Sequence, residues 1–226
     1  MVRVTLLVTM IALAFAVVIH IANYALLLYN RSTLLNPIVA GIATWAGVAA
    51  SVVAFFAVIA TTVVLTNWLI ARRAVTYERH EMPDPRPVWQ LWLGCLLPFV
   101  NLFWAPVFVI ELARAEGRLA WLRAPIVVWW CAWLVSFCVS VFSFSTSFTR
   151  DAQGIANNTV AIIIAYLAAL AALLLTLRMY RGFEHQAVDR PVKRWVLVNA
   201  DEKPSPQDAE SESAPRVESD RDEPAA

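Results

Sequence analysis

The sequence predicts an all-α membrane protein with four transmembrane helices and one proline-broken segment that is re-entrant or interfacial. Apolar residues make up 60% of the chain and charged residues only 15%, whereas a soluble domain carries about 25% charged residues. A hydrocarbon core about 30 Å thick requires roughly 20 consecutive apolar residues, and four runs are long enough. The predicted spans are residues 4–29, 42–70, 126–148 and 159–180, within a helical bundle domain of residues 1–183.

The first two spans differ from simple membrane helices in their length. The first is an apolar run that directly follows a basic residue, Arg3, and this arrangement is also found in secretory signal peptides. The apolar core of a signal peptide extends over about 7 to 15 residues, so this longer run is predicted to be a retained helix. The second run exceeds the length that a bilayer requires, and we expect its helix to tilt or to extend towards Arg72 and Arg73.

The apolar segment of residues 88–112 contains Pro98 and Pro106, with Asn101 between them. Each proline removes a backbone donor and disfavours helical geometry at the residue before it. The segment is long enough to span a bilayer, so two topologies are open: it crosses the membrane, or it turns back.

The distribution of Lys and Arg distinguishes these topologies, since cytoplasmic loops near membrane helices accumulate positive charge. If residues 88–112 return to the side they left, one side of the membrane receives 13 Lys and Arg residues and the other only Arg31 and Arg150. If the segment crosses, the division is 9 to 6. We therefore predict a re-entrant segment, both termini in the cytoplasm, and a location in the plasma membrane.

The C-terminal region changes composition after the last predicted span. Residues 184–198 form a basic juxtamembrane segment, and residues 199–226 form an acidic tail rich in Pro and Ser that is predicted to be disordered. Basic side chains beside the inner leaflet attract anionic lipid headgroups. The expected headgroup contacts are Arg178, Arg181, Lys193 and Arg194.

A candidate intramembrane polar face on the first span consists of His20, Asn23 and Tyr24, because the i, i+3 and i+4 positions of a helix share one side. Polar groups are costly in lipid, so this face is expected to point into the bundle. Two interpretations of His20 stay open: hydrogen-bonded packing near the outer end of the helix, and a proton relay or ligand contact.

A second candidate motif lies in the broken segment and consists of Trp92, Pro98, Asn101, Pro106, Glu111 and Arg114. Irregular backbone at membrane depth is tolerated only where protein or a water-filled cavity covers it, and broken helices often bind ligands. The structural alternative places Pro98 and Asn101 at the tip of a hairpin. Pro106 would then lie near the first turn of a helix, where its missing donor costs little, and Glu111 would pair with Arg114 one turn on.

The broken segment also carries a pattern made of Trp92, Pro98, Asn101, Leu102, Pro106 and Glu111. This pattern resembles the signature of domain-of-unknown-function family 4328, a group of multi-pass membrane proteins found mainly in actinobacteria. The resemblance is best over residues 62–177. It implies a membrane location and a helical fold, and it carries over no catalytic residue.

Patterns of catalysis and cofactor binding are absent from the sequence. It has no serine nucleophile elbow, no phosphate-binding glycine loop and no HExxH motif. The residues Glu78, His80, Glu81 and Asp84 match no zinc-binding pattern, so we expect a solvated linker there. We therefore expect no enzyme activity, no cofactor, no metal and no nucleic-acid partner.

Small residues at helical spacing, such as Ala43, Gly47 and Ser51, favour close packing of the predicted spans. The leading hypothesis is a non-catalytic structural or accessory component of a cell-envelope complex. Its contacts would be the lipid bilayer and partner membrane proteins or further copies of itself. The alternative is a small-molecule or lipid transporter or channel subunit that uses the broken segment between Pro98 and Glu111.

Overall fold

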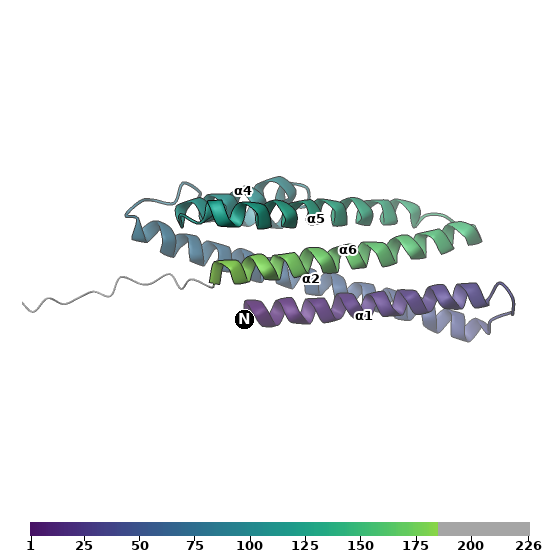
Figure 1. Cartoon of the computed structure of the whole chain (residues 1–226). Helices are drawn as coiled ribbons and strands as arrows, with labels where there is room; N and C mark the ends of the chain where they lie inside the picture. Colours follow the sequence, from purple (N-terminus) through teal and green to yellow (C-terminus); the bar gives the residue numbers. More distant parts are fainter. Residues whose placement is uncertain (185–226) are drawn as a thin grey trace, which may run out of the picture. The chain divides into compact units, whose positions relative to one another are not determined.

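The computed structural model of the chain describes residues 1–184, which fold into six α-helices and no strand. Their bounds are α1 Val2–Tyr29, α2 Pro37–Arg79, α3 Val88–Leu96, α4 Val100–Ala115, α5 Leu119–Thr146 and α6 Ala152–Glu184 (Figure 1). The predicted acidic tail, and the basic juxtamembrane segment apart from Glu184, lie outside the described residues.

Four of the helices, α1, α2, α5 and α6, are long and apolar enough to cross a membrane. This finding confirms the predicted all-α membrane fold with four spanning helices. The longest, α2, has 43 residues, which correspond to about 65 Å at a rise of roughly 1.5 Å per residue. Because a bilayer core is only about 30 Å thick, α2 extends well beyond it and continues through Arg72 and Arg73.

Local sequence signals define the start of α2. The Asn36 side chain accepts a hydrogen bond from the N–H of Ile38 at 2.9 Å, and Pro37 occupies the first helical position. Asn is a preferred N-cap residue, and proline at the first position lacks only an N–H that has no helical partner. The connection from α1 to α2 therefore needs no long-range contact to end where it does.

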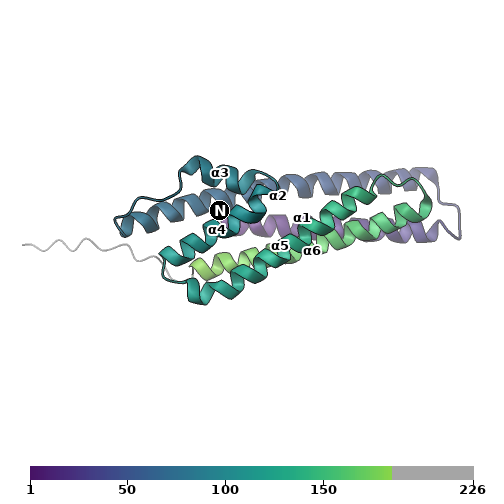
Figure 2. The same ribbon diagram turned by 90° about the horizontal axis from the view of Figure 1, so that it is seen from above.

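The helices pack in a continuous series. Helix α1 lies between α2 and α6, and α6 lies between α1 and α5. The short helices α3 and α4 pack on each other, α4 also packs on α5, and both pack on α2 (Figure 2). Within the described residues the backbones of α2 and α5 do not approach each other closely, and α4 packs on both of them.

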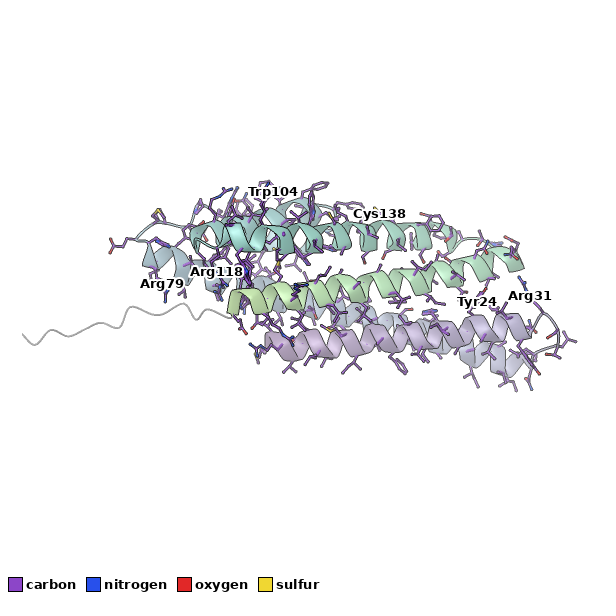
Figure 3. The ribbon with its side chains drawn as sticks, in the orientation of Figure 1. Tyr24, Arg31, Arg79, Trp104, Arg118 and Cys138 are labelled. Atoms are coloured by element: carbon purple, nitrogen blue, oxygen red, sulfur yellow. The ribbon has the colours of Figure 1, made fainter. Side chains whose placement is uncertain are left out.

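One end of the bundle, which we call the arginine end, collects helix termini and basic side chains. Arg3 at the start of α1 pairs with Glu184 in the last described turn of α6 at 2.6 Å. Figure 3 shows Arg79 and Arg118 at this end and Arg31 at the opposite end. The start of α1 and the described end of α6 therefore lie on the same side of the bundle.

Residues 88–112 form a helical hairpin, which we call the α3–α4 hairpin. Arg86, just before α3, pairs with Glu111 near the end of α4 at 2.9 Å. The two ends of the hairpin thus lie together at the arginine end, and its tip points along the bundle (Figure 2). The segment does not pass from one end of the bundle to the other.

The largest apolar core lies where the hairpin packs on α2, α5 and α6. The side chains of Phe108, Leu112 and Phe183 are fully buried there. On α2 nearer the opposite end, Phe55 and Phe56 remain 61% and 62% exposed. Such exposure suits a surface in lipid, whose tails are as apolar as these side chains.

Candidate functional site

The tip of the α3–α4 hairpin is a tight turn centred on Phe99. Leu97 has extended backbone, as expected of a residue before proline. Phe99 adopts φ 66° and ψ −45°, and the N–H of Val100 donates to the oxygen of Pro98 at 2.8 Å. A γ-turn with positive φ is strained for a bulky residue. The Phe99 ring lies edge-on to Phe137 of α5 with centroids 5.3 Å apart, which holds the turn in place.

Three of the predicted motif residues follow the hairpin from base to tip. Trp92 is half-buried in α3, Pro98 is exposed at the tip, and Asn101 is half-buried in the first turn of α4. Pro98 and Asn101 therefore lie where the structural alternative places them. A ligand-binding role for these residues stays a prediction.

The prediction that Pro106 lies near the first turn of a helix, where its missing N–H costs little, is wrong. Helix α4 begins at Val100, so Pro106 lies inside it and leaves the carbonyl oxygen of Leu102 without a helical N–H. The indole Nε1–H of Trp130 in α5 donates to that oxygen at 2.8 Å. A side chain from α5 therefore replaces the hydrogen bond that proline removes, as a buried backbone acceptor requires.

Close approach of α3 and α4 depends on Gly94. A Cβ atom at this position would lie 2.6 Å from Cε2 of Phe108 and 3.3 Å from Cβ of Trp104. Only glycine lets the fully buried Phe108 ring lie directly against the α3 backbone. The residues around Gly94 carry no local pattern that indicates this contact.

Arg73 is the centre of a charged cluster at the base of the hairpin, and its side chain is fully buried. Its Nη2 donates to Oδ1 of Asp84 at 2.7 Å and its Nε to Oδ2 at 3.0 Å. Its Nη1 donates to Oε2 of Glu111 at 3.2 Å and to the backbone oxygen of Phe108 at 3.1 Å. A buried guanidinium requires such partners, and bidentate hydrogen bonding to a carboxylate is the strongest interaction it makes.

Arg86 completes this cluster on the other side of Glu111. Its Nη2 donates to Oε1 of Glu111 at 2.9 Å, and its backbone N–H donates to Oδ1 of Asp84 at 2.9 Å. The guanidinium lies 5.2 Å from the ring centre of Trp104, a favourable cation–π arrangement. The predicted pair between Glu111 and Arg114 is wrong, because Glu111 faces Arg73 and Arg86 while Arg114 is exposed.

A second charged group joins α2 to the turn between α4 and α5. Arg72 donates from Nε to Oε1 of Glu116 at 2.6 Å and from Nη2 to the oxygen of Phe183 at 2.8 Å. Arg118 donates from Nη1 to the same oxygen of Phe183 at 3.0 Å and also binds the oxygen of Gly182. These contacts attach the last described turn of α6 to the base of the hairpin.

We call the two groups together the arginine clamp, which consists of Arg72, Arg73, Arg86 and Arg118 with Asp84, Glu111 and Glu116. Every carboxylate in it contacts at least one arginine. The side chains of the clamp come from α2, α4 and the connections before α3 and α5, and they bind backbone oxygens of α6. The prediction of a solvated linker after α2 is therefore wrong for Asp84, because its side chain is paired with Arg73 and only 22% exposed.

The acidity of Asp84 reflects its place in the clamp. Burial by itself raises the pKa of this carboxyl because it penalises the charged form. Hydrogen bonds from the Arg73 guanidinium and the Arg86 N–H, with the positive charges of both arginines, outweigh burial. The pKa of Asp84 therefore lies below its ordinary value of 3.8.

The predicted polar face of α1 reaches a second candidate site near the end opposite to the clamp. His20 is only 7% exposed, its Nε2 lies 3.1 Å from Oγ of Ser51 in α2, and its ring stacks on Tyr166 of α6 at 5.5 Å. These contacts match the packing interpretation of His20. Asn23 faces the same space, whereas Tyr24 is half-buried outside its lining.

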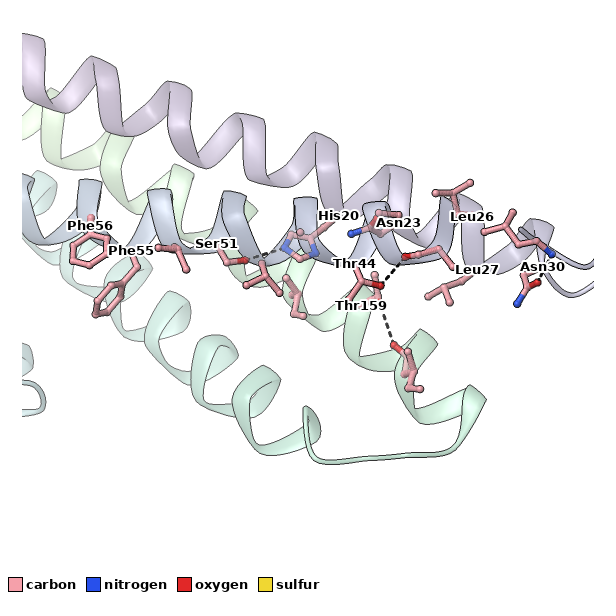
Figure 4. Close-up of a pocket in the computed structure, with 18 residues that line it drawn as sticks. His20, Asn23, Leu26, Leu27, Asn30, Thr44, Ser51, Phe55, Phe56 and Thr159 are labelled. Carbon is pink, nitrogen blue, oxygen red and sulfur yellow. Dashed lines mark hydrogen bonds between the residues drawn. The ribbon is translucent and has the colours of Figure 1, made fainter. Parts of the chain in front are cut away.

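The space beside these residues is a groove of about 760 Å³ between α1, α2 and α6, which we call the outer groove (Figure 4). Its walls are mainly apolar. Its polar lining residues are His20, Asn23, Asn30, Thr44, Ser51 and Thr159. The described residues that line it include no Asp, Glu, Lys or Arg.

Gly47 brings α1 and α2 together beside the outer groove. A Cβ atom at Gly47 would lie 2.7 Å from Nδ2 of Asn23 and 3.4 Å from Cε1 of His20. The small residues predicted to favour packing on α2 thus include one that positions the polar face of α1 directly.

The basic residues predicted to contact lipid are only partly described. Arg178 and Arg181 are exposed on α6 and border a hollow of about 420 Å³ that Trp121 of α5 also lines. Lys193 and Arg194 lie outside the described residues. Within residues 1–184 no group of three or more His, Cys, Asp or Glu side chains is placed to hold a metal ion.

Comparison with known proteins identifies one family. A family model described as "Domain of unknown function (DUF4328)" matches residues 31–185. No curated protein and no solved structure matches the chain. The matched region contains α2 to α6 and the whole arginine clamp, whereas α1 precedes it. Since the match covers more than half of the sequence, this chain belongs to the DUF4328 family.

Proposed function

We propose that this protein is a non-catalytic plasma-membrane protein that serves as a structural or accessory component of a cell-envelope complex. The observation that carries the proposal is the arginine clamp. Its carboxylates are all bound by arginines, and its arginines also bind backbone oxygens of α4 and α6. Charged groups used in this way hold helices together and leave a rigid surface for contacts with other proteins.

The proposed topology places the arginine end in the cytoplasm. Basic residues collect on the cytoplasmic side of membrane proteins, and this end carries the clamp together with exposed Arg114 and Arg123. Helix α3 has 9 residues and α4 has 16, or about 14 Å and 24 Å at the helical rise. Both are shorter than a bilayer core of about 30 Å, which supports a hairpin that enters and leaves from the cytoplasm.

Anionic lipid headgroups are the proposed small partners at this end. Arg178 and Arg181 lie one turn apart beside the hollow lined by Trp121. An indole ring suits the membrane interface, and each basic residue near an anionic leaflet contributes about 1 kcal/mol. We extend the proposal to Lys193 and Arg194 from their position in the sequence alone.

Site-specific photo-crosslinking in native membranes tests the accessory role. A photoreactive amino acid replaces Arg114 or Arg123 at the arginine end, and Val128, 53% exposed on the side of α5, serves as the control position. We expect a discrete crosslinked species from the first two positions, identified by mass spectrometry as a membrane protein of the envelope or a second copy. The control position should give only lipid adducts.

Loss of any position-dependent protein crosslink, with no oligomer in the membrane, would contradict this role. Reporter fusions after Arg118 give an independent test of orientation. A reporter found outside the cell at that point would overturn the cytoplasmic placement of the arginine end.

A transporter or channel subunit is the second candidate, and one observation favours it. An apolar cavity of about 140 Å³ lies between the hairpin and α2, α5 and α6, lined in part by Cys95, Val109 and Trp133. Its lining does not include Asn101 or Glu111, so passage along it would not use the predicted polar contacts. Transport of a small apolar molecule that survives Glu111→Gln but is blocked by Val109→Trp would support this candidate.

A further inference from the structure

We propose that the outer groove binds one membrane lipid whose polar group is uncharged and carries hydroxyl or ester oxygens, such as a diacylglycerol. This inference goes beyond the proposed accessory role, because it concerns α1, α2 and α6 near the end opposite to the clamp. The groove volume of about 760 Å³ falls within the range of about 300–1,000 Å³ typical of small-molecule sites.

The walls of the groove indicate that its occupant arrives from the lipid. Val48, Val52, Phe55 and Phe56 of α2 line it while each remains between 47% and 62% exposed. Apolar side chains that remain so exposed on a spanning helix face lipid, so the groove opens towards the bilayer beside α2. An acyl chain enters such an opening without leaving an apolar environment.

The polar groups of the groove define the chemistry of the head. Most of their hydrogen-bonding capacity is used locally: Thr44 donates to the oxygen of Ala40, Thr159 to that of Ile155, and Ser51 contacts His20. These interactions are drawn as dashed lines in Figure 4.

Asn23 differs from these groups. Its amide has no hydrogen-bond partner among residues 1–184, although Nδ2 lies near the α2 backbone at Gly47 and the side chain faces the groove. A free amide both donates and accepts, which matches a hydroxyl or ester oxygen. A phosphate or ammonium group would be desolvated here without an opposite charge, and this cost excludes ionic headgroups.

The proposal is tested with the purified full-length chain in detergent and a diacylglycerol that carries a photoreactive acyl chain. Labelled peptides are mapped by mass spectrometry, and competition uses unlabelled diacylglycerol or phosphatidylglycerol. We expect labelling of groove peptides from α1, α2 and α6. Diacylglycerol should compete at least tenfold better than phosphatidylglycerol.

Two matched pairs of variants separate the groove from the general lipid surface. Val48→Trp fills the groove, whereas Val53→Trp adds the same bulk at an exposed position of α2 outside its lining. Asn23→Leu removes the free amide, whereas Asn157→Leu makes the same change on α6 outside the lining. We expect Val48→Trp to abolish labelling, Asn23→Leu to weaken binding about three- to tenfold, and both controls to bind like the wild type.

The thermal unfolding temperature of each variant verifies that it is folded. Equal labelling of the Val48→Trp and Val53→Trp proteins would overturn the proposal. Equal competition by phosphatidylglycerol would also overturn it, because it would identify an ordinary annular lipid contact. Neither result affects the crosslinking test of the accessory role, which probes the arginine end.

Discussion

The indole N–H of Trp130 in α5 donates to the carbonyl oxygen of Leu102 in α4 at 2.8 Å, and this oxygen is the one that Pro106 deprives of its helical partner. The bond makes the proline-containing helix dependent on its neighbour. It also explains why Pro106 is accommodated in a helix interior, where proline otherwise lowers stability strongly.

Trp130→Phe keeps an aromatic ring but removes the N–H donor. The carbonyl oxygen of Leu102, a buried residue, then has no hydrogen-bond partner. We expect the free energy of unfolding to fall by about 1–3 kcal/mol, measured by chemical unfolding of the purified protein in detergent. In a Pro106→Ala background the restored N–H satisfies the same oxygen, so the loss should be smaller. Equal losses in both backgrounds would show that the bond does not compensate for the proline.

Glu111→Gln leaves Arg73 without one charged partner and Arg86 without its carboxylate. Breaking a buried ion pair costs about 3–5 kcal/mol, and because Glu111 is 19% exposed, we expect a loss of about 2–3 kcal/mol. Glu78→Gln, at an exposed position, should change stability by less than about 0.5 kcal/mol. If both variants unfold at the same denaturant concentration as wild type, Glu111 has no structural role in the clamp.

The Asp84 carboxyl group is expected to make the stability of the folded protein depend on pH. Its pKa is lower in the folded protein than the ordinary value of 3.8, so the unfolded chain binds its proton more readily. The stabilisation is therefore complete above pH about 4 and is lost as the pH falls below that value. Unfolding temperatures of wild type and Asp84→Asn measured from pH 7 downwards should converge in acid. If the unfolding temperatures of the two proteins differ by the same amount at every pH, ionisation of Asp84 is not the cause of the pH-dependent stability.

Gly94→Ala adds a Cβ atom that would lie 2.6 Å from the Phe108 ring. We expect a loss of about 1–3 kcal/mol from overpacking, with partial recovery in a Gly94→Ala, Phe108→Leu double variant. Gly41→Ala is the matched control, because nothing lies within 4 Å of its added Cβ. That control should be neutral or stabilising by up to about 1 kcal/mol, since alanine favours helix. If Gly94→Ala is as stable as the wild type, α3 and α4 move apart to accommodate the added Cβ atom without a measurable cost.

The four spanning helices could be predicted from the sequence because the length and apolarity of each are local properties. The hairpin tip at Pro98 could also be predicted from the sequence, since proline restricts the backbone of the residue before it whatever the surroundings. The shared face of His20 and Asn23 followed from helical spacing, although their partners on α2 and α6 did not.

The clamp could not be predicted, because its partners are distant in sequence. Local spacing suggested Arg114 as the partner of Glu111, but Arg73 lies 38 residues away and offers a fully buried guanidinium. One signal was present: Arg73 continues the helical face of Thr66 and Leu69, which are both buried. That pattern places an arginine inside the bundle and requires an acidic partner for it.

The distances along the chain within the clamp constrain how the protein matures during synthesis. Arg72 binds the backbone oxygen of Phe183, which is made 111 residues later. Until α6 leaves the ribosome and inserts, the guanidinium groups at the base of the hairpin lack part of their bonding and stay hydrated. The nascent bundle therefore remains open on this side, and a chain truncated before α6 should be recognised by membrane quality-control proteases as incomplete.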